Sequence, residues 1–272
     1  MKVIKYLVVF VLFIGLGISL WFYYPQYQIY QLKKHAVVVN KNSDQISYIN
    51  YYRNTRTSQI HHLALGDSII RGVGAGKNEN FVSQFSNKLA EQTHKKIEFQ
   101  NQGISGITSG ELNELVQEGR FDDSIKHSDI VTINVGGNDI LRIANGQNIR
   151  TVIQSYDQLQ TSFTKNLSDI TSRITKLNPK VTIVFLELYN PLSPDDQMYP
   201  LADKMLPKWN LNIYEVAKKL PGAIVIETTK VINGDNLQNL SPDGIHPNPA
   251  GYTAISEQMI YQFKHQLRKS SV

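Results

Sequence analysis

Cysteine is absent from this chain of 272 residues. A thiol nucleophile, a disulfide framework and a cysteine-ligated zinc are therefore all excluded. Histidine occurs seven times, but no two histidines combine metal-ligand spacing with an acidic partner. We therefore expect no bound metal and no other cofactor.

A strong charge of one sign is also missing from most of the chain. The net charge is +5, to which residues 1–24 contribute +2 and residues 25–60 contribute +4, so that residues 61–272 sum to −1. A nearly neutral domain gives no electrostatic reason to expect a nucleic-acid partner. The basic N-terminal part is suited instead to anionic lipid headgroups or envelope polymers. No obligate protein partner is evident.

Charged residues are absent from residues 6–24, a run of 19 that is close to the roughly 20 residues that cross a bilayer as a helix. Trp21 and Tyr24 belong to an aromatic belt at one end of this run. Pro25 is expected to end the helix. We therefore predict that residues 1–24 form an N-terminal transmembrane anchor.

A cleaved signal peptide is the main alternative for this segment. It requires a shorter apolar stretch and small residues at its exit, whereas residues 20–23 are bulky. Lys2 and Lys5 lie closer to the apolar run than the lysines beyond it, which favours an N-terminus inside the cell. We predict a single-pass protein of the cell membrane, with residues 25–60 as a juxtamembrane stalk and an extracytoplasmic domain at 61–272.

Apolar runs alternate with amphipathic stretches after the predicted stalk. The runs, typical of buried strands, are residues 62–66, 97–101, 129–135, 181–186 and 223–226. The clearest helical stretches lie at residues 159–177, 209–220 and 249–268. This alternation predicts an α/β fold with a five-stranded parallel sheet, whose site should lie at the carboxyl ends of the strands.

Residues with catalytic potential follow several of these predicted strands. A serine hydrolase needs a nucleophile, a base and a carboxylate that orients the base. Ser68, His246 and Asp243 can fill these three roles. The backbone N–H groups of Ser68 and Gly106 and the side-chain amide of Asn138 can stabilise an oxyanion. Each short motif alone is typical of a turn, but a set that supplies every role indicates catalysis.

These motifs resemble those of the SGNH or GDSL-type esterases and lipases. The matching blocks appear in the family's order, and they are Gly66-Asp67-Ser68, residues 101–106, Gly136-Gly137-Asn138-Asp139 and Asp243-Gly244-Ile245-His246-Pro247. The resemblance implies a flavodoxin-like three-layer αβα sandwich and the triad Ser68, Asp243 and His246. It also implies that Gly106, rather than Gly103, is the oxyanion glycine. Together with the anchor, the chain is similar to the membrane-anchored lipase/acylhydrolase branch of Gram-positive bacteria.

We therefore expect a serine esterase that cleaves carboxylic esters or thioesters through an acyl-enzyme on Ser68. The predicted membrane anchor favours lipid or fatty-acyl esters as substrates. One alternative is an O-acetylesterase that acts on envelope polysaccharide or peptidoglycan. Another is a non-catalytic, membrane-anchored binding module, against which the intact Ser, Asp, His and Asn residues argue.

Several neighbouring residues are interpreted without a catalytic role. His61 and His62 open the first predicted strand and are expected to be exposed. Asp67 and Asp139 are expected to cap helices or to support the site. The proline-rich residues 189–207 could form a substrate-facing loop or, equally, a plain irregular connection.

A second segment, rich in glycine, also lies close to the predicted site. Gly72, Gly74 and Gly76 lack the Lys-Ser/Thr ending of a phosphate-binding loop. We therefore interpret residues 72–76 as a flexible loop beside the site.

Overall fold

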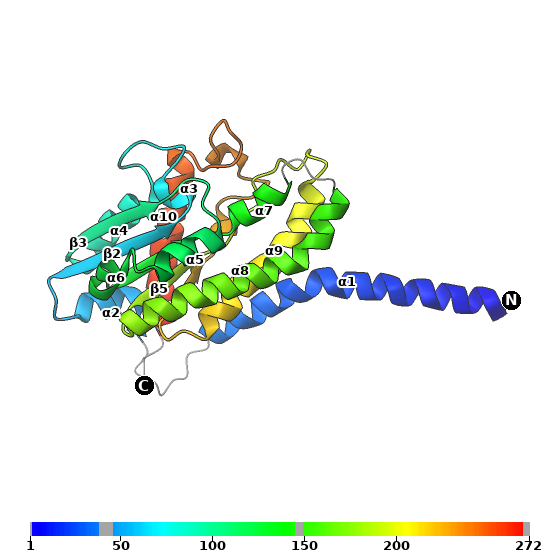
Figure 1. Ribbon diagram of the computed structural model, residues 1–272, viewed down its shortest axis with the longest axis horizontal. Helices are drawn as coiled ribbons and strands as arrows, with labels where there is room; N and C mark the ends of the chain where they lie inside the picture. The colour runs from blue at the N-terminus through cyan, green and yellow to red at the C-terminus, as the bar shows by residue number, and fades with distance from the viewer. Residues whose placement is uncertain (1, 38–45, 145–148, 269–272) are drawn as a thin grey trace.

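A five-stranded sheet forms the centre of the computed structural model, which describes residues 2–37, 46–144 and 149–268 (Figure 1). The strands are β2 (Gln59–Gly66), β3 (Lys96–Gly103), β4 (Ile130–Asn134), β5 (Thr182–Leu186) and β6 (Ile224–Ile226). They pair in parallel in the order β3-β2-β4-β5-β6. The predicted α/β fold with a five-stranded parallel sheet is confirmed. The strand order reverses between β2 and β4, and ligands bind at such switch points.

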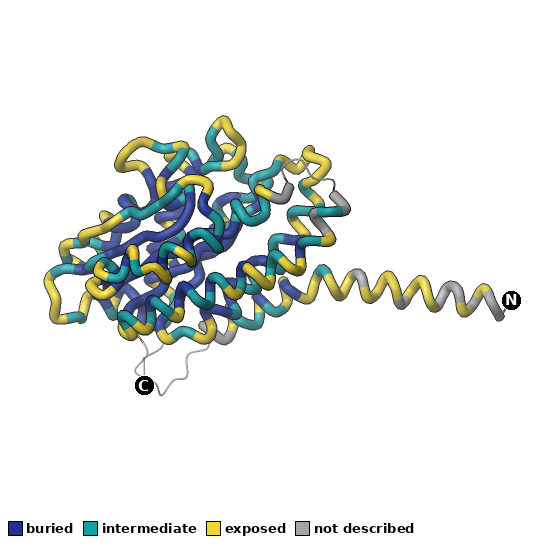
Figure 2. Tube along the Cα trace, in the orientation of Figure 1, coloured by how far each residue is buried: buried dark blue, intermediate teal, exposed yellow. Residues whose placement is uncertain are grey.

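Helices cover both faces of the sheet. One face packs against α5 (Ser109–Gln117), α6 (Asp122–His127), α8 (Ile149–Leu177) and α9 (Tyr199–Lys218), and the other against α2 (Tyr48–Asn54), α4 (Phe81–Thr93) and α10 (Pro249–His265). Alternate side chains of β2 enter the two apolar clusters, with Leu63 and Leu65 on one face and Ile60 and Ala64 on the other. The buried strands therefore form the middle layer, which Figure 2 shows as the darkest part of the chain.

Short helices follow the carboxyl ends of three strands and bring the polar motifs to one edge of the sheet. They are α3 (Ser68–Arg71) after β2, α7 (Gly137–Ala144) after β4, and the 3₁₀ helices η1 (Thr228–Lys230) and η2 (Leu237–Asn239) after β6.

Strand β3 lies at the edge of the sheet and is more exposed than the sequence predicted. Only β2 flanks it, and the Phe99 side chain is 39% exposed. The prediction of a buried strand at residues 97–101 was therefore wrong about burial. Residues 97–101 read Ile-Glu-Phe-Gln-Asn, and this mixture of apolar and polar side chains is typical of a partly exposed strand rather than of one buried on both faces.

His62 is buried, which corrects the prediction that it is exposed. It lies within β2 rather than at its start, and its ring packs edge-on against Phe85. The Nδ1 atom lies 2.9 Å from the hydroxyl of Ser86, and Nε2 lies 2.8 Å from that of Thr132. Burial lowers the pKa of His62 to about 3, so the ring is neutral at physiological pH.

Helix α1 (Lys2–Val37) continues through Pro25, so the prediction that this proline ends the helix was wrong. A proline inside a helix removes one backbone hydrogen bond, but Pro25 and Ile29 are buried where α1 meets α9. This packing stabilises the helix beyond the proline. The N-terminal half of α1 projects away from the rest of the molecule (Figures 1 and 2).

The predicted transmembrane anchor at residues 1–24 is not supported. Among the helices of residues 2–37, 46–144 and 149–268, none is long and apolar enough to cross a membrane.

Part of the segment predicted as a stalk packs with the sheet and the helices that cover it. Strand β1 (Ile46–Ser47) pairs antiparallel with β7 (Leu267–Arg268). In α2 the buried Tyr52 hydroxyl donates to Thr182 Oγ1 at 2.6 Å, and the Tyr48 hydroxyl donates to the Ala223 carbonyl at 3.0 Å. The division of the chain into an anchor, a stalk and a domain remains a prediction.

The irregular segment predicted at residues 189–207 is shorter than expected because α9 begins at Tyr199. Pro200 lies in the first turn, where the missing N–H costs nothing. Pro207 lies inside the helix, where packing of the buried Met205 and Trp209 offsets the lost hydrogen bond.

Candidate active site

The end of β2 and the start of α3 position Ser68. A side chain at Gly66 would place its Cβ 1.9 Å from the carbonyl oxygen of Asn134, so only glycine fits this position. Asp67 caps α3 by accepting a hydrogen bond from the Ile69 N–H at 2.9 Å. Ser68 is the first residue of the helix, and its backbone N–H has no acceptor within the described residues.

The structure brings Ser68, His246 and Asp243 together from distant parts of the chain. The Ser68 hydroxyl lies 2.8 Å from Nε2 of His246, and Nδ1 of the same ring lies 2.6 Å from Oδ2 of Asp243. An ionised carboxylate accepts the Nδ1 proton, which leaves Nε2 as an acceptor for the serine. The three side chains therefore form the hydrogen-bonded chain that a serine nucleophile requires.

The ionised form of Asp243 is favoured by its own loop. Desolvation raises the pKa of Asp243, but hydrogen bonds from the N–H groups of Ile245 and His246, together with the imidazole, outweigh it and lower the pKa to about 2. The two N–H groups donate to Oδ1 at 2.9 and 3.0 Å. Oδ2 is thus left for the His246 ring.

Two further segments hold the loop of residues 243–247 in place. The Tyr189 hydroxyl, just after β5, donates to the Ile245 carbonyl at 2.8 Å. The glycine-rich segment lies against the same loop, because a Cβ on Gly74 would come within 2.4 Å of the Pro247 carbonyl oxygen. Both segments therefore contact the loop that carries His246.

The predicted oxyanion donors lie at the ends of β3 and β4. Gly106 is in the left-handed region with φ +80°, inside a turn closed by the Ile107 N–H and the Ile104 carbonyl. Its N–H has no acceptor within the described residues, whereas the Gly103 N–H donates to Asn101 Oδ1 at 3.0 Å. The geometry therefore favours Gly106 over Gly103 as a donor.

Asn138 stands in the first turn of α7 and faces the Gly106 turn. Its Nδ2 atom donates one hydrogen to the Ile107 carbonyl at 3.0 Å. The second hydrogen of the amide remains for another acceptor. Asn138 can thus support the turn and donate to an oxyanion at once.

Arg142 and Glu111 also support this turn, and the sequence analysis missed both. The Arg142 guanidinium donates to the Gly106 carbonyl at 2.7 Å and to both carboxylate oxygens of Glu111 at 2.9 Å. Glu111 forms a capping box with Thr108 at the start of α5. The Thr-x-x-Glu spacing was a readable signal for this cap, and Arg142 lies one helical turn after Asn138.

Asp67 is buried and Asp139 is half-buried next to the site, and both support the elements that form it. Burial raises the pKa of Asp67 to about 6, although hydrogen bonds from the Ile69 N–H and Asn134 amide oppose the shift. Burial also raises the pKa of Asp139, which accepts hydrogen bonds from the N–H and hydroxyl of Ser109. Asp67 thus connects α3 to β4, and Asp139 connects α7 to α5, as expected for capping and supporting groups.

The chemistry available at the site is proton transfer and nucleophilic attack. Across the described parts of the chain, no group of three or more histidine, aspartate or glutamate side chains could hold a metal ion. The geometry supplies a hydroxyl, an imidazole and hydrogen-bond donors that converge from separate strand ends.

Known proteins are similar to this chain over most of its length. The model of the GDSL-like lipase/acylhydrolase family matches residues 64–254. A spore germination lipase from Bacillus licheniformis is 28% identical over 205 residues, which cover 74% of this chain and 94% of the relative. An uncharacterized protein from Bacillus subtilis is 23% identical over 206 residues, 75% of this chain and 81% of the relative.

A solved structure shows a similar arrangement of the chain. The lipase Lip_vut3 from a goat rumen metagenome is 28% identical and superposes with a TM-score of 0.67. The match covers 75% of this chain and 97% of the lipase.

Proposed function

The chain belongs to the GDSL-like lipase/acylhydrolase family and is an ester hydrolase, and we propose that it works through an acyl-enzyme on Ser68. The observation that supports this mechanism best is the position of His246. Its ring lies within hydrogen-bond distance of both the Ser68 hydroxyl and the Asp243 carboxylate. The imidazole of His246 can therefore act as the base that accepts the proton of the serine hydroxyl.

Each protein group has one role in the proposed reaction. His246 Nε2 takes the Ser68 proton while Oγ attacks the ester carbonyl carbon, and Asp243 stabilises the imidazolium that forms. The N–H groups of Ser68 and Gly106 and the Asn138 amide hold the resulting oxyanion. His246 then protonates the leaving alcohol or thiol, and water, activated by the same ring, releases the acyl group from Ser68.

Labelling with a fluorophosphonate tests this mechanism against the alternative of a non-catalytic binding module. The wild type should be labelled at Ser68, and Ser68→Ala should lose both labelling and turnover of a short p-nitrophenyl ester. Ser105→Ala, an exposed serine near the site, is the matched control and should retain both. Full activity in folded Ser68→Ala protein would refute the acyl-enzyme, and unlabelled, folded wild type would favour a binding module.

We propose that the substrates are lipid or fatty-acyl esters. Two similar proteins, each 28% identical over more than nine-tenths of its own length, are described as lipases. An O-acetyl ester on envelope polysaccharide or peptidoglycan is the second candidate, favoured by the polar cavity described below. A chain-length profile separates them, because long acyl chains should be preferred in the first case and acetyl in the second.

We also propose that the enzyme is held at the cell membrane by the N-terminal half of α1, with its domain outside the cell. Support comes from apolar side chains exposed around this part of the helix, among them Phe10, Leu12 and Leu16, which are 64%, 65% and 57% exposed. Residues 1–24 also contain no acidic residue. Cell fractionation and protease treatment of intact cells test both statements, and a protected, soluble enzyme would refute them.

A further inference from the structure

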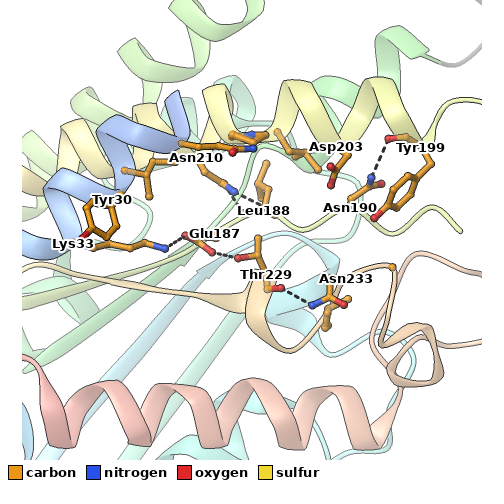
Figure 3. Close-up of a pocket in the computed structure, with 16 residues that line it drawn as sticks. Tyr30, Lys33, Glu187, Leu188, Asn190, Tyr199, Asp203, Asn210, Thr229 and Asn233 are labelled. Atoms are coloured by element: carbon orange, nitrogen blue, oxygen red, sulfur yellow. Dashed lines mark hydrogen bonds and ion pairs between the residues drawn. The ribbon is translucent and has the colours of Figure 1, made fainter. Parts of the chain in front are cut away.

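A cavity of about 400 Å³ lies between α1, α9 and the loops that follow β5 and β6. Figure 3 shows Tyr30 and Lys33 of α1 at one end and Asn190, Tyr199 and Asp203 at the other. None of the proposed catalytic or oxyanion residues lines it. Its volume falls within the roughly 300–1,000 Å³ of small-molecule sites.

The loop after β5 separates this cavity from the loop of residues 243–247, which carries His246. Leu188 and Asn190 line the cavity, while Tyr189 between them donates its hydroxyl to the Ile245 carbonyl. A ligand in the cavity therefore lies one strand connection away from the loop of His246.

The charges at the floor of the cavity neutralise one another. Lys33 forms ion pairs with Glu187 at 3.2 Å and with Glu227 at 2.5 Å. Lys230 also pairs with Glu227, and Thr229 donates a hydrogen bond to Glu187. Two lysines thus balance two carboxylates, which leaves no excess charge at the floor for an ionic ligand. An acyl chain in the cavity would displace water from these polar groups and would offer them no hydrogen bonds in return. The desolvation of the polar groups would therefore make its binding unfavourable.

The mouth of the cavity carries polar groups that have no partner. Within residues 2–37, 46–144 and 149–268, the side chains of Gln26, Tyr30 and Asp203 make no hydrogen bond or ion pair, and all three are exposed, so that only water contacts their polar atoms in the free protein. Gln26 can donate and accept, and Asp203 accepts. The rings of Tyr30 and Tyr199 add broad apolar faces that end in hydroxyls.

We propose that this cavity binds an uncharged sugar unit. A sugar offers hydroxyls that donate to Asp203 and exchange hydrogen bonds with Gln26, and its C–H faces pack on tyrosine rings. A polyhydroxylated, neutral ligand is thus the chemical class that matches the unpaired polar mouth and the balanced floor. The site is additional to the esterase centre and does not depend on the acyl-enzyme.

Calorimetric titration tests the proposal on the full chain, kept in a detergent without a sugar headgroup. The probes are short neutral oligosaccharides of glucose and of N-acetylglucosamine, with dodecanoate as the acyl probe. We expect the wild type to bind at least one oligosaccharide, and Asp203→Ala and Tyr30→Ala each to weaken it about tenfold or more. Asp157→Ala, an exposed aspartate on α8 outside the cavity, is the matched control and should bind as the wild type does.

Three results would overturn the proposal. They are no oligosaccharide binding at millimolar concentration, binding that both cavity variants leave unchanged, and competition by dodecanoate. Turnover of p-nitrophenyl acetate should stay at the wild-type level in both cavity variants. Conversely, Ser68→Ala should lose turnover and keep sugar binding, so the failure of one proposal is distinguishable from the failure of the other.

Vesicles distinguish two sources of the sugar. Tighter binding to vesicles of phosphatidylcholine with a glycosyl diacylglycerol than to the free disaccharide assigns the unit to a lipid headgroup. Equal or tighter binding of free oligosaccharides assigns it to an envelope polymer.

Discussion

The loop around Asp243 determines which tautomer of the His246 ring faces Ser68. Asp243 accepts three hydrogen bonds, two from backbone N–H groups and one from His246. Its low pKa keeps it ionised, so Nδ1 of the ring holds the proton and Nε2 faces the serine. The proton acceptor for Ser68 is thus in place before any ester binds.

Replacing Asp243 with Asn should lower kcat by roughly 10³- to 10⁴-fold, because the amide allows the wrong tautomer of His246. Steady-state hydrolysis of p-nitrophenyl acetate measures the change. The control is Asp235→Asn, an exposed aspartate in the preceding loop, which should leave kcat unchanged. A loss below tenfold in a folded Asp243→Asn protein would contradict the role assigned to the carboxylate.

Arg142 is a positioning residue for the Gly106 turn, because it contacts the turn and not the reacting atoms. Arg142→Met should lower kcat about tenfold and leave KM for a short ester nearly unchanged, since an oxyanion donor acts in the transition state. Arg142→Lys should recover only part of the rate, because lysine lacks the planar fork that reaches Gly106 and Glu111 together. Arg120→Met, an exposed arginine, is the control. A lower melting temperature without a change in kcat would indicate a purely structural contact.

Helix α1 illustrates how one element joins two parts of the molecule. Its C-terminal half packs on α9, where Ile29 is buried and Lys33 pairs with Glu187 and Glu227. Desolvation lowers the pKa of Lys33, but the two carboxylates outweigh it and raise the pKa, so the side chain is charged. The C-terminal half of α1 is therefore held against α9 and the ends of β5 and β6 by apolar packing and ion pairs.

Lys33→Met should loosen this docking by roughly 1–3 kcal/mol. Breaking a buried pair costs about 3–5 kcal/mol, and solvent screening reduces that value because the Lys33 side chain is 33% exposed. Urea unfolding and the rate of proteolysis within α1 measure the effect. The neighbouring, exposed Lys34→Met should behave like the wild type. Equal protease resistance in both variants would show that the ion pairs do not hold the helix.

Two buried groups, His62 and Asp67, change the free energy of unfolding in opposite directions as the pH falls. Burial lowers the pKa of His62 to about 3 in the native state. Below pH 6.5, His62 is therefore protonated in the unfolded chain and still neutral in the native state. Its contribution to the free energy of unfolding therefore falls as the pH drops from 6.5 towards 3. Asp67, with its pKa raised to about 6 by burial, is protonated in the native state first, so its contribution rises as the pH drops through 6.

The two contributions should nearly cancel between about pH 4 and 6, each changing by about 1.4 kcal/mol per pH unit. His62→Gln removes one of them. The variant should be less stable than the wild type at pH 7.5, and the difference should shrink by about 1.4 kcal/mol for each pH unit below 6.5. Urea unfolding at pH 7.5, 6 and 5 measures this, with the exposed His127→Gln as control. A difference that stays constant with pH would mean that His62 does not titrate as inferred.

Local sequence determined the sheet and the candidate site. Apolar runs marked β2, β4, β5 and β6 to within a few residues, because a strand buried on both faces must be apolar along its length. The motifs after β2, β3, β4 and β6 singled out Ser68, Gly106, Asn138, Asp243 and His246, since the carboxyl ends of parallel strands meet at one edge. Their catalytic roles remain a prediction that labelling and kinetics will test.

Tertiary packing decided what local sequence could not. Pro25 stays helical because α9 covers the next turn, and His62 is buried because α4 covers the face of β2 to which it points. Arg142 reaches Gly106 across 36 positions, and the cavity beside α1 exists because α1 lies against α9 and the loops after β5 and β6. Each of these features depends on contacts between distant segments, whose free energy outweighs local preference but leaves no periodic signal in the chain.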